Sequence, residues 1–77
     1  METEFTTLDK APIGETAQVA SLPGGGALRR MLDLGLVEGA RIEPLYVSPS
    51  GGTRAYLLRG AVIALRRDVA AQISVEL

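Results

Sequence analysis

The side chains that could do chemistry in this sequence are mostly arginines. Seven of the eight basic residues are arginine, and the stretch from Pro44 to Arg67 contains no acidic residue. A guanidinium group fits a carboxylate or a phosphate in a bidentate manner and is common at protein interfaces. The stretch is therefore compatible with a protein interface, with a surface for RNA or single-stranded DNA, or with a bias of composition alone. Its four arginines are Arg54, Arg59, Arg66 and Arg67.

The sequence lacks most of the side chains that catalysis and metal binding require. The sequence has no cysteine and no histidine, so it lacks thiolate ligands, imidazole ligands and the commonest general acid–base. The nine acidic residues are scattered, and no local spacing gathers the several oxygen ligands that a hard cation needs. We therefore expect no enzymatic activity, no cofactor, and only weak binding of ferrous iron or zinc.

Nucleic-acid binding is the weaker of the two interface hypotheses. The net charge is −1, so the chain as a whole does not attract phosphate. Two tyrosines and one phenylalanine are the only aromatic residues, and Tyr46 and Tyr56 make a poor stacking platform for bases. We expect no nucleic-acid partner, and RNA or single-stranded DNA binding through the four arginines remains the alternative function.

Two apolar side chains have no evident place in a core. Leu57 and Val62 fall on the opposite parity from the better core candidates of their strands, which are Tyr56, Leu58, Ile63 and Leu65. In a small barrel these two side chains either pack under the helix or form an exposed patch, and exposed apolar residues next to arginine are typical of an interface centre. We therefore expect a partner-binding surface at Leu57, Arg59 and Val62. A second candidate is the polar side of the helix described next, with Arg29 and Arg30.

A short helix is predicted over residues 27–34. Leu28, Met31 and Leu32 recur at helical spacing, and Arg29 and Asp33 are four residues apart, where opposite charges can pair. Gly35 is expected to end the helix in the left-handed conformation, with Leu36 folding back onto Met31. A type II turn with Gly39 at its third position then leads into a strand.

Five strands are predicted around this helix. Gly14 and Gly60 are expected in the turns that precede two of them, and Pro44 indicates an edge or a bulge in a third. Residues 1–7 are expected to be flexible, and Leu8 is the first anchor, on a single helical turn that Pro12 stops. The predicted strands are residues 16–22, 40–48, 53–59, 61–65 and 72–76.

These elements predict one mainly β domain over residues 1–77. Many short strands and glycine turns in so few residues indicate a small, strongly bent barrel, since an open sheet this narrow would leave one face uncovered. No apolar run is long enough to span a membrane, and the acidic N-terminus is unlike a signal peptide. We expect a cytoplasmic protein without direct membrane insertion.

The run Leu32-Asp33-Leu34-Gly35-Leu36-x-x-Gly39 resembles the signature of the FeoA family. The likeness extends from about Leu8 to Val75. It implies an SH3-like barrel of about five strands with one short helix inserted after the first strand. It also implies an accessory role in bacterial ferrous-iron transport, beside the membrane permease FeoB.

Members of this family are thought to act by protein contact and not by chemistry. The same domain also occurs fused to iron-dependent repressors, but no helix-turn-helix precedes it in this sequence. Self-association is left open. The sequence departs from the family pattern at Glu38, at Ala61 and at Leu57, which replaces a usually polar residue.

Overall fold

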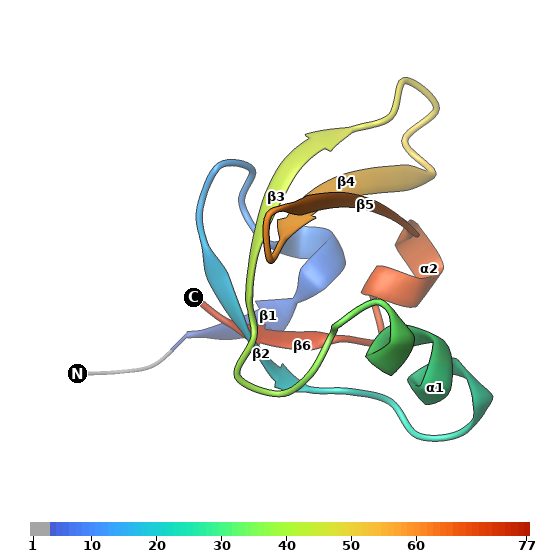
Figure 1. The fold of residues 1–77 in the computed structure, drawn as a ribbon. Helices are drawn as coiled ribbons and strands as arrows, with labels where there is room; N and C mark the ends of the chain where they lie inside the picture. The colour runs from blue at the N-terminus through green and yellow to red at the C-terminus, as the bar shows by residue number, and fades with distance from the viewer. Residues whose placement is uncertain (1–3) are drawn as a thin grey trace.

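Six short strands form one strongly curved antiparallel sheet in the computed structural model, which describes residues 4–77 (Figure 1). The hydrogen-bonded order of the strands is β1-β6-β2-β3-β4-β5. The prediction of a small, mainly β, SH3-like barrel is confirmed. The elements are β1 (Phe5–Thr7), the 3-10 helix η1 (Leu8–Lys10), β2 (Ala17–Ser21), α1 (Gly26–Asp33), β3 (Arg41–Val47), β4 (Thr53–Leu58), β5 (Ala61–Arg66), α2 (Arg67–Ala70) and β6 (Ser74–Glu76).

Strand β1 was missed by the sequence pattern. It has three residues, too few for an alternation to be read, and Phe5 is largely exposed. In the structure these residues pair with β6 and are not a free segment, with Thr6 opposite Val75. Of the segment expected to be flexible, residues 1–3 lie outside the described part. Because β1 comes first, α1 follows the second strand and not the first.

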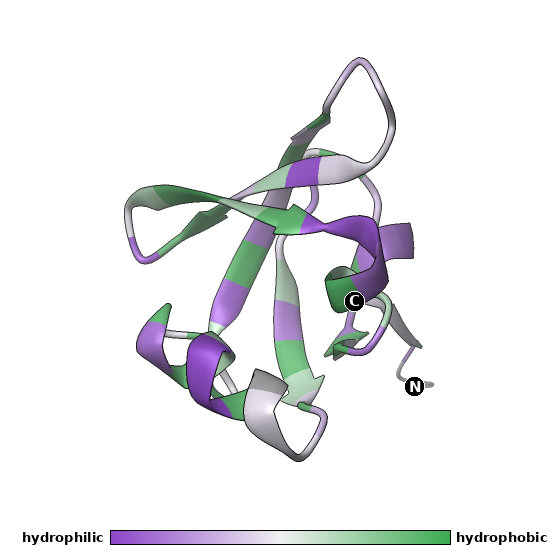
Figure 2. Ribbon diagram, turned by 90° about the vertical axis from the view of Figure 1, so that its right-hand side faces the viewer, coloured by the Kyte–Doolittle hydropathy of each residue, from purple (hydrophilic) through white to green (hydrophobic). Residues whose placement is uncertain are grey.

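The core is formed by alternate residues of the strands together with η1 and α1. Ala17 and Val19 of β2 face inward, as do Tyr56 and Leu58 of β4, so their predicted orientation is confirmed. Figure 2 shows the hydrophobic colour along β5, giving way to the hydrophilic residues that begin α2. The buried cluster is Leu8, Ala11, Ala17, Val19, Met31, Leu36, Ile42, Tyr56, Leu58, Leu65, Ala70, Ile73 and Val75.

Helix α1 ends in a Schellman motif. The Leu36 N–H donates to the Met31 carbonyl at 2.9 Å, and the Gly35 N–H donates to the Leu32 carbonyl at 3.0 Å. Gly35 has a φ of 92°, which glycine adopts without steric cost. Leu36 and Met31 are both buried in the core cluster. The motif therefore ties the end of the helix to the barrel interior.

Strand β3 lies inside the sheet although it contains Pro44. The register between β3 and β4 shifts between Pro44 and Tyr46, which marks a bulge. The ladder between β3 and β2 ends at Ile42, and the Pro44 backbone faces that unpaired side, so the missing N–H donor costs no ladder hydrogen bond. The Pro44 carbonyl accepts a hydrogen bond of 2.8 Å from the Gly14 N–H. A bulge of this kind bends the strand that carries it and increases its local twist.

A two-residue turn joins β4 to β5. Leu58 pairs with Ala61, and between them Arg59 and Gly60 have φ values of 53° and 81°. Positive φ at both central positions identifies a type I′ turn, whose twist matches that of the flanking strands. The predicted strand over residues 53–59 is therefore one residue too long, because Arg59 belongs to the turn. Gly14 and Gly39, the other glycines predicted in turns, also have positive φ.

Candidate functional site

Arg54 is not a surface residue. Its side chain lies on the same face of β4 as Tyr56, and only 6% of the residue is exposed. The guanidinium donates hydrogen bonds to the backbone carbonyls of Leu8 at 3.0 Å and Ala11 at 2.9 Å, and to that of Asp9. Arg54 therefore satisfies the carbonyls of η1 and of Ala11, which follows it. Its guanidinium is not available for the nucleic-acid contact that the alternative function requires of the four arginines.

Tyr56 reinforces the same junction. Its hydroxyl donates to the Leu8 carbonyl at 3.3 Å, and the guanidinium carbon of Arg54 lies 5.8 Å from the centre of its ring. Burial raises the pKa of Tyr56 above its ordinary value of 10.0, and the positive charge of Arg54 opposes that rise. The two side chains fasten η1 to β4. Sequence alone could not identify this role, because it depends on carbonyls more than forty residues away.

The remaining arginines of the acid-free stretch are exposed and spread apart. Arg59 lies in the turn at one end of the β4–β5 hairpin, and Arg66 lies at the other end of β5, opposite Thr53. Five residue steps of strand separate Ala61 from Arg66, a length of about 17 Å. Arg66 forms an exposed ion pair of 3.8 Å with Asp68. The arginines therefore do not converge on one phosphate-binding groove.

The hairpin does bring the predicted apolar residues together. Leu57 and Val62 face each other across β4 and β5, and Glu43 of β3 continues the same row. Val62 is 61% exposed and Leu57 is 37% exposed. The next row on this face consists of Tyr46, Ala55 and Ala64, in which Tyr46 and Ala64 are exposed. We call the exposed members Tyr46, Leu57, Val62 and Ala64 the outer-face patch.

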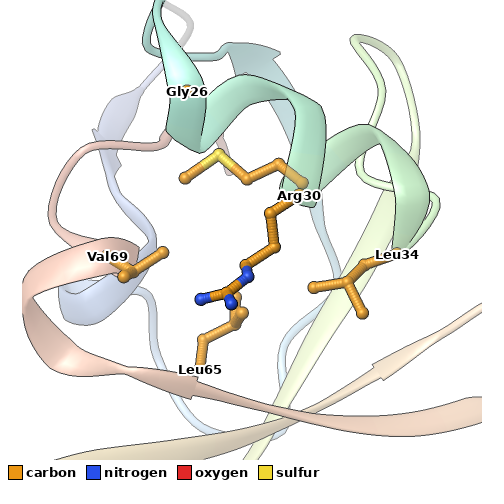
Figure 3. A pocket seen from close by; sticks show the side chains of 6 residues that line it. Gly26, Arg30, Leu34, Leu65 and Val69 are labelled. Atoms are coloured by element: carbon orange, nitrogen blue, oxygen red, sulfur yellow. The ribbon is translucent and has the colours of Figure 1, made fainter.

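A cleft of about 380 Å³ opens on the other side of β5, between α1, β5 and α2. Figure 3 shows the Arg30 side chain extending from α1 into this cleft, between the aliphatic side chains of Leu34 and Val69 and towards Leu65. Neither an ion pair nor a hydrogen bond to the Arg30 side chain is found within residues 4–77. The lining residues are Gly26, Arg30, Met31, Leu34, Leu65 and Val69.

The two arginines predicted on the polar side of the helix lie in different surroundings. Arg30 lines the cleft, whereas Arg29 is exposed outside it. The pairing of Arg29 with Asp33 suggested by their spacing is not formed, since the one ion pair within residues 4–77 joins Arg66 and Asp68. The sequence pattern missed Leu34, Leu65 and Val69 as neighbours, because they come from three separate elements.

Other kinds of site were sought in the described part of the chain. Residues 4–77 contain no group of three or more Asp, Glu, His or Cys side chains placed to hold a metal ion. Among the same residues, no helix has the length and apolar character needed to cross a membrane. The surfaces that stand out are the outer-face patch and the cleft, one on each side of strand β5.

Comparison with known proteins gives a family and several similar structures. A model of the FeoA domain matches residues 6–77. The FeoA protein of Chlorobium tepidum is 33% identical, with a TM-score of 0.85 over 94% of this chain and 70% of that chain. A structure described as an iron uptake regulatory protein (FeoA) is 25% identical, with a TM-score of 0.86 over 96% of this chain and all of that chain.

The same fold occurs in a larger protein of a different kind. A manganese-dependent transcriptional repressor is 22% identical, with a TM-score of 0.85 over 95% of this chain and 41% of the repressor. At this identity the likeness concerns the fold alone. No curated protein matches the chain significantly.

Proposed function

The chain belongs to the FeoA family, and on that premise we propose that it is a cytoplasmic accessory protein of bacterial ferrous-iron uptake. The observation that carries this proposal is the match of the FeoA domain over residues 6–77, nearly the whole chain. The side chains agree with a non-enzymatic role, because histidine and cysteine are absent from the sequence. Such a protein acts through contact.

The proposed partner is a FeoB-type ferrous-iron permease. The surface that best fits such a contact is the outer-face patch together with Arg59. Its apolar residues form a cross-strand cluster, and an arginine lies at its edge, which is the composition of a protein interface. Val62 and Leu57 would form the apolar centre, and Arg59 would contact an acidic group of the permease.

The test is capture of the permease by tagged protein. Detergent-solubilised membranes from the native, iron-starved host are passed over the immobilised chain, and the bound permease is identified by its peptide masses. Val62→Glu places a charge in the centre of the patch, and Val62 is exposed enough for the fold to tolerate it. We expect this variant to lower the captured permease by more than about tenfold.

The matched control is Phe5→Glu, at a residue that is also 61% exposed but lies on β1, at the opposite end of the sheet order. It should leave capture unchanged. If Val62→Glu also leaves capture unchanged, the contact lies elsewhere, and Arg29 and Arg30 of α1 become the next residues to replace. If the wild-type chain captures no permease, the proposed partner is wrong.

A further inference from the structure

Strand β5 has a free edge. It is the last strand in the sheet order and pairs only with β4 among residues 4–77. No backbone hydrogen bond within the described residues reaches the other side of β5. The strand is six residues long, which is enough to accept a further strand.

The hairpin turn determines which backbone groups point to this edge. In a two-residue type I′ hairpin the pair that closes the turn, Leu58 and Ala61, is hydrogen-bonded in both directions. The pairs then alternate, so Ala61, Ile63 and Leu65 bond to β4. Continuing that alternation makes Arg67 a bonded position, and its N–H does donate to the Gly52 carbonyl at 2.9 Å. The N–H and C=O groups of Val62, Ala64 and Arg66 therefore point outward.

The residues at the centre of this edge are not of the kinds that protect an edge strand. Natural edge strands are commonly guarded by lysine, proline, a bulge or an inward-pointing charge. Residues 61–65 are all aliphatic, and the register between β5 and β4 has no shift. Val62 and Ala64, which carry two of the outward N–H groups, are also exposed.

The charges around β5 select the kind of strand that can bind there. Arg59 lies in the turn before the strand, Arg66 is its last residue and Arg67 follows it at the start of α2. Arg30 lines the cleft beside the strand. Two acidic residues are close to these groups in sequence. Asp68 is paired with Arg66, and Asp33 lies on α1 three residues after Arg30 without forming an ion pair within residues 4–77. A second copy of β5 would bring arginines together at both ends, which is unfavourable. An acidic strand would be attracted at both ends.

We propose that β5 binds an extended acidic peptide segment of a partner protein, which adds to the sheet as a seventh strand. Alternate residues of the added strand point to opposite faces of the sheet. One set would pack beside Val62 and Ala64. The other would enter the cleft near Leu65, where Arg30 can receive a carboxylate. The proposal rests on the proposed function only for the identity of the protein that supplies the segment.

The test uses the purified chain and a synthetic peptide that alternates glutamate and valine. Amide hydrogen exchange is followed by NMR for residues 61–66. In the free protein the Val62 and Ala64 amides should exchange fast, while those of Ile63 and Leu65 are protected. Added peptide should protect Val62 and Ala64, and a peptide with lysine in place of glutamate should bind at least about tenfold more weakly.

Ala64→Pro provides the sharper variant. It removes an N–H that faces the free edge and no hydrogen bond to β4, and edge strands tolerate proline at such positions. We expect peptide affinity to fall by about tenfold or more, because the partner carbonyl loses its donor. Ala64→Val is the matched control and should bind as the wild type does. If Ala64→Pro does not fold, the exchange pattern of the wild-type protein decides.

The proposal would be overturned if the acidic peptide did not bind, or if it bound without protecting Val62 and Ala64. Two further results would overturn it by assigning the edge to another partner. In the first, these amides are protected in the free protein in a manner that depends on its concentration, which would assign the edge to a second copy of the chain. A competing single-stranded oligonucleotide that binds more tightly than the peptide would assign it to nucleic acid. None of these measurements involves the permease, so failure here is distinct from failure of permease capture.

Discussion

Arg54 holds two distant segments of the chain together with one buried charge. It donates to carbonyls of Leu8, Asp9 and Ala11, and among residues 4–77 no carboxylate forms an ion pair with it. Its Nε is buried and has no hydrogen-bond partner within residues 4–77. The charge is therefore stabilised by carbonyl dipoles, which suits the fork geometry of arginine and not the single ammonium of lysine.

Replacing Arg54 should weaken the fold. Arg54→Met keeps much of the packing volume but removes the side-chain donor of the Asp9 and Ala11 carbonyls and one of the donors of the Leu8 carbonyl. We expect a cost of about 2–4 kcal/mol in the free energy of unfolding. Urea denaturation measures the change. Arg66→Met, at an exposed ion pair, is the control and should change stability by less than about 0.5–1 kcal/mol. Equal effects of the two variants would contradict the anchoring role of Arg54.

Tyr56 should make stability depend on alkaline pH. Its pKa in the fold is raised above 10.0 by burial, so the folded state holds this proton more tightly than the unfolded chain does. Its contribution is fully present below pH 10.0 and is lost as the pH rises above that value. Denaturant midpoints measured from about pH 9 to about pH 11 should fall more steeply for wild type than for Tyr56→Phe.

A Tyr56→Phe variant that follows the wild-type curve would show that the Tyr56 hydroxyl has the same pKa in the folded and unfolded chain.

Among the elements, the cap of α1 offers the most direct test. A Cβ built on Gly35 would meet the side chains of Leu58 and Arg59 at 3.8 Å, which is ordinary contact. The cost of substitution therefore comes from the φ of 92° alone. We expect Gly35→Ala to cost about 1–2 kcal/mol in unfolding free energy and Gly35→Val more, because a β-branched residue fits this conformation worst.

Gly24→Ala is the matched control. Gly24 has no positive φ, and a Cβ there would meet nothing within 4 Å. This variant should be neutral or slightly more stable, since alanine restricts the unfolded chain. A melting temperature of Gly35→Val within a degree or two of wild type would contradict the cap.

Elements with a clear local pattern could be predicted from the sequence. The alternation of β4 and β5 separated Tyr56 and Leu58 from Leu57 and Val62, and the structure places these side chains on opposite faces. Strand β1 could not be predicted, because its strand character comes from pairing with β6, seventy residues away. The inward orientation of Arg54 was missed for a similar reason, since a charged side chain is buried only where distant carbonyls receive it.

The cleft was beyond prediction because it exists only once α1, β5 and α2 are assembled. The sequence indicated Arg30 through the polar side of the helix and Leu65 as a core candidate of its strand, but it gave no reason to place Leu34 and Val69 beside them. Leu34 is in fact 41% exposed at the cleft mouth. Local periodicity reports which residues are apolar, and only the tertiary arrangement shows which of them remain open to a ligand.

At the scale of the whole molecule, we predict that the protein binds ferrous iron and zinc only weakly. The described residues contain no cluster of three Asp, Glu, His or Cys side chains, and the sequence lacks the thiolate and imidazole donors that favour iron(II) and zinc. Calorimetry with Fe²⁺ under anaerobic conditions, and with Zn²⁺, should detect no stoichiometric site tighter than about 100 μM. A site of micromolar affinity would show that the protein takes part in handling the ion itself.

The pairing of β1 with β6 brings the two ends of the described chain together. The Leu77 N–H donates to the Glu4 carbonyl at 2.9 Å, and the C-terminus lies on the left of Figure 1, whereas α1 and α2 lie on the right. A tether attached at either end thus leaves the barrel at nearly the same point. A domain attached at either end, or inserted into another chain through both ends, would therefore have the cleft on the side away from the attachment.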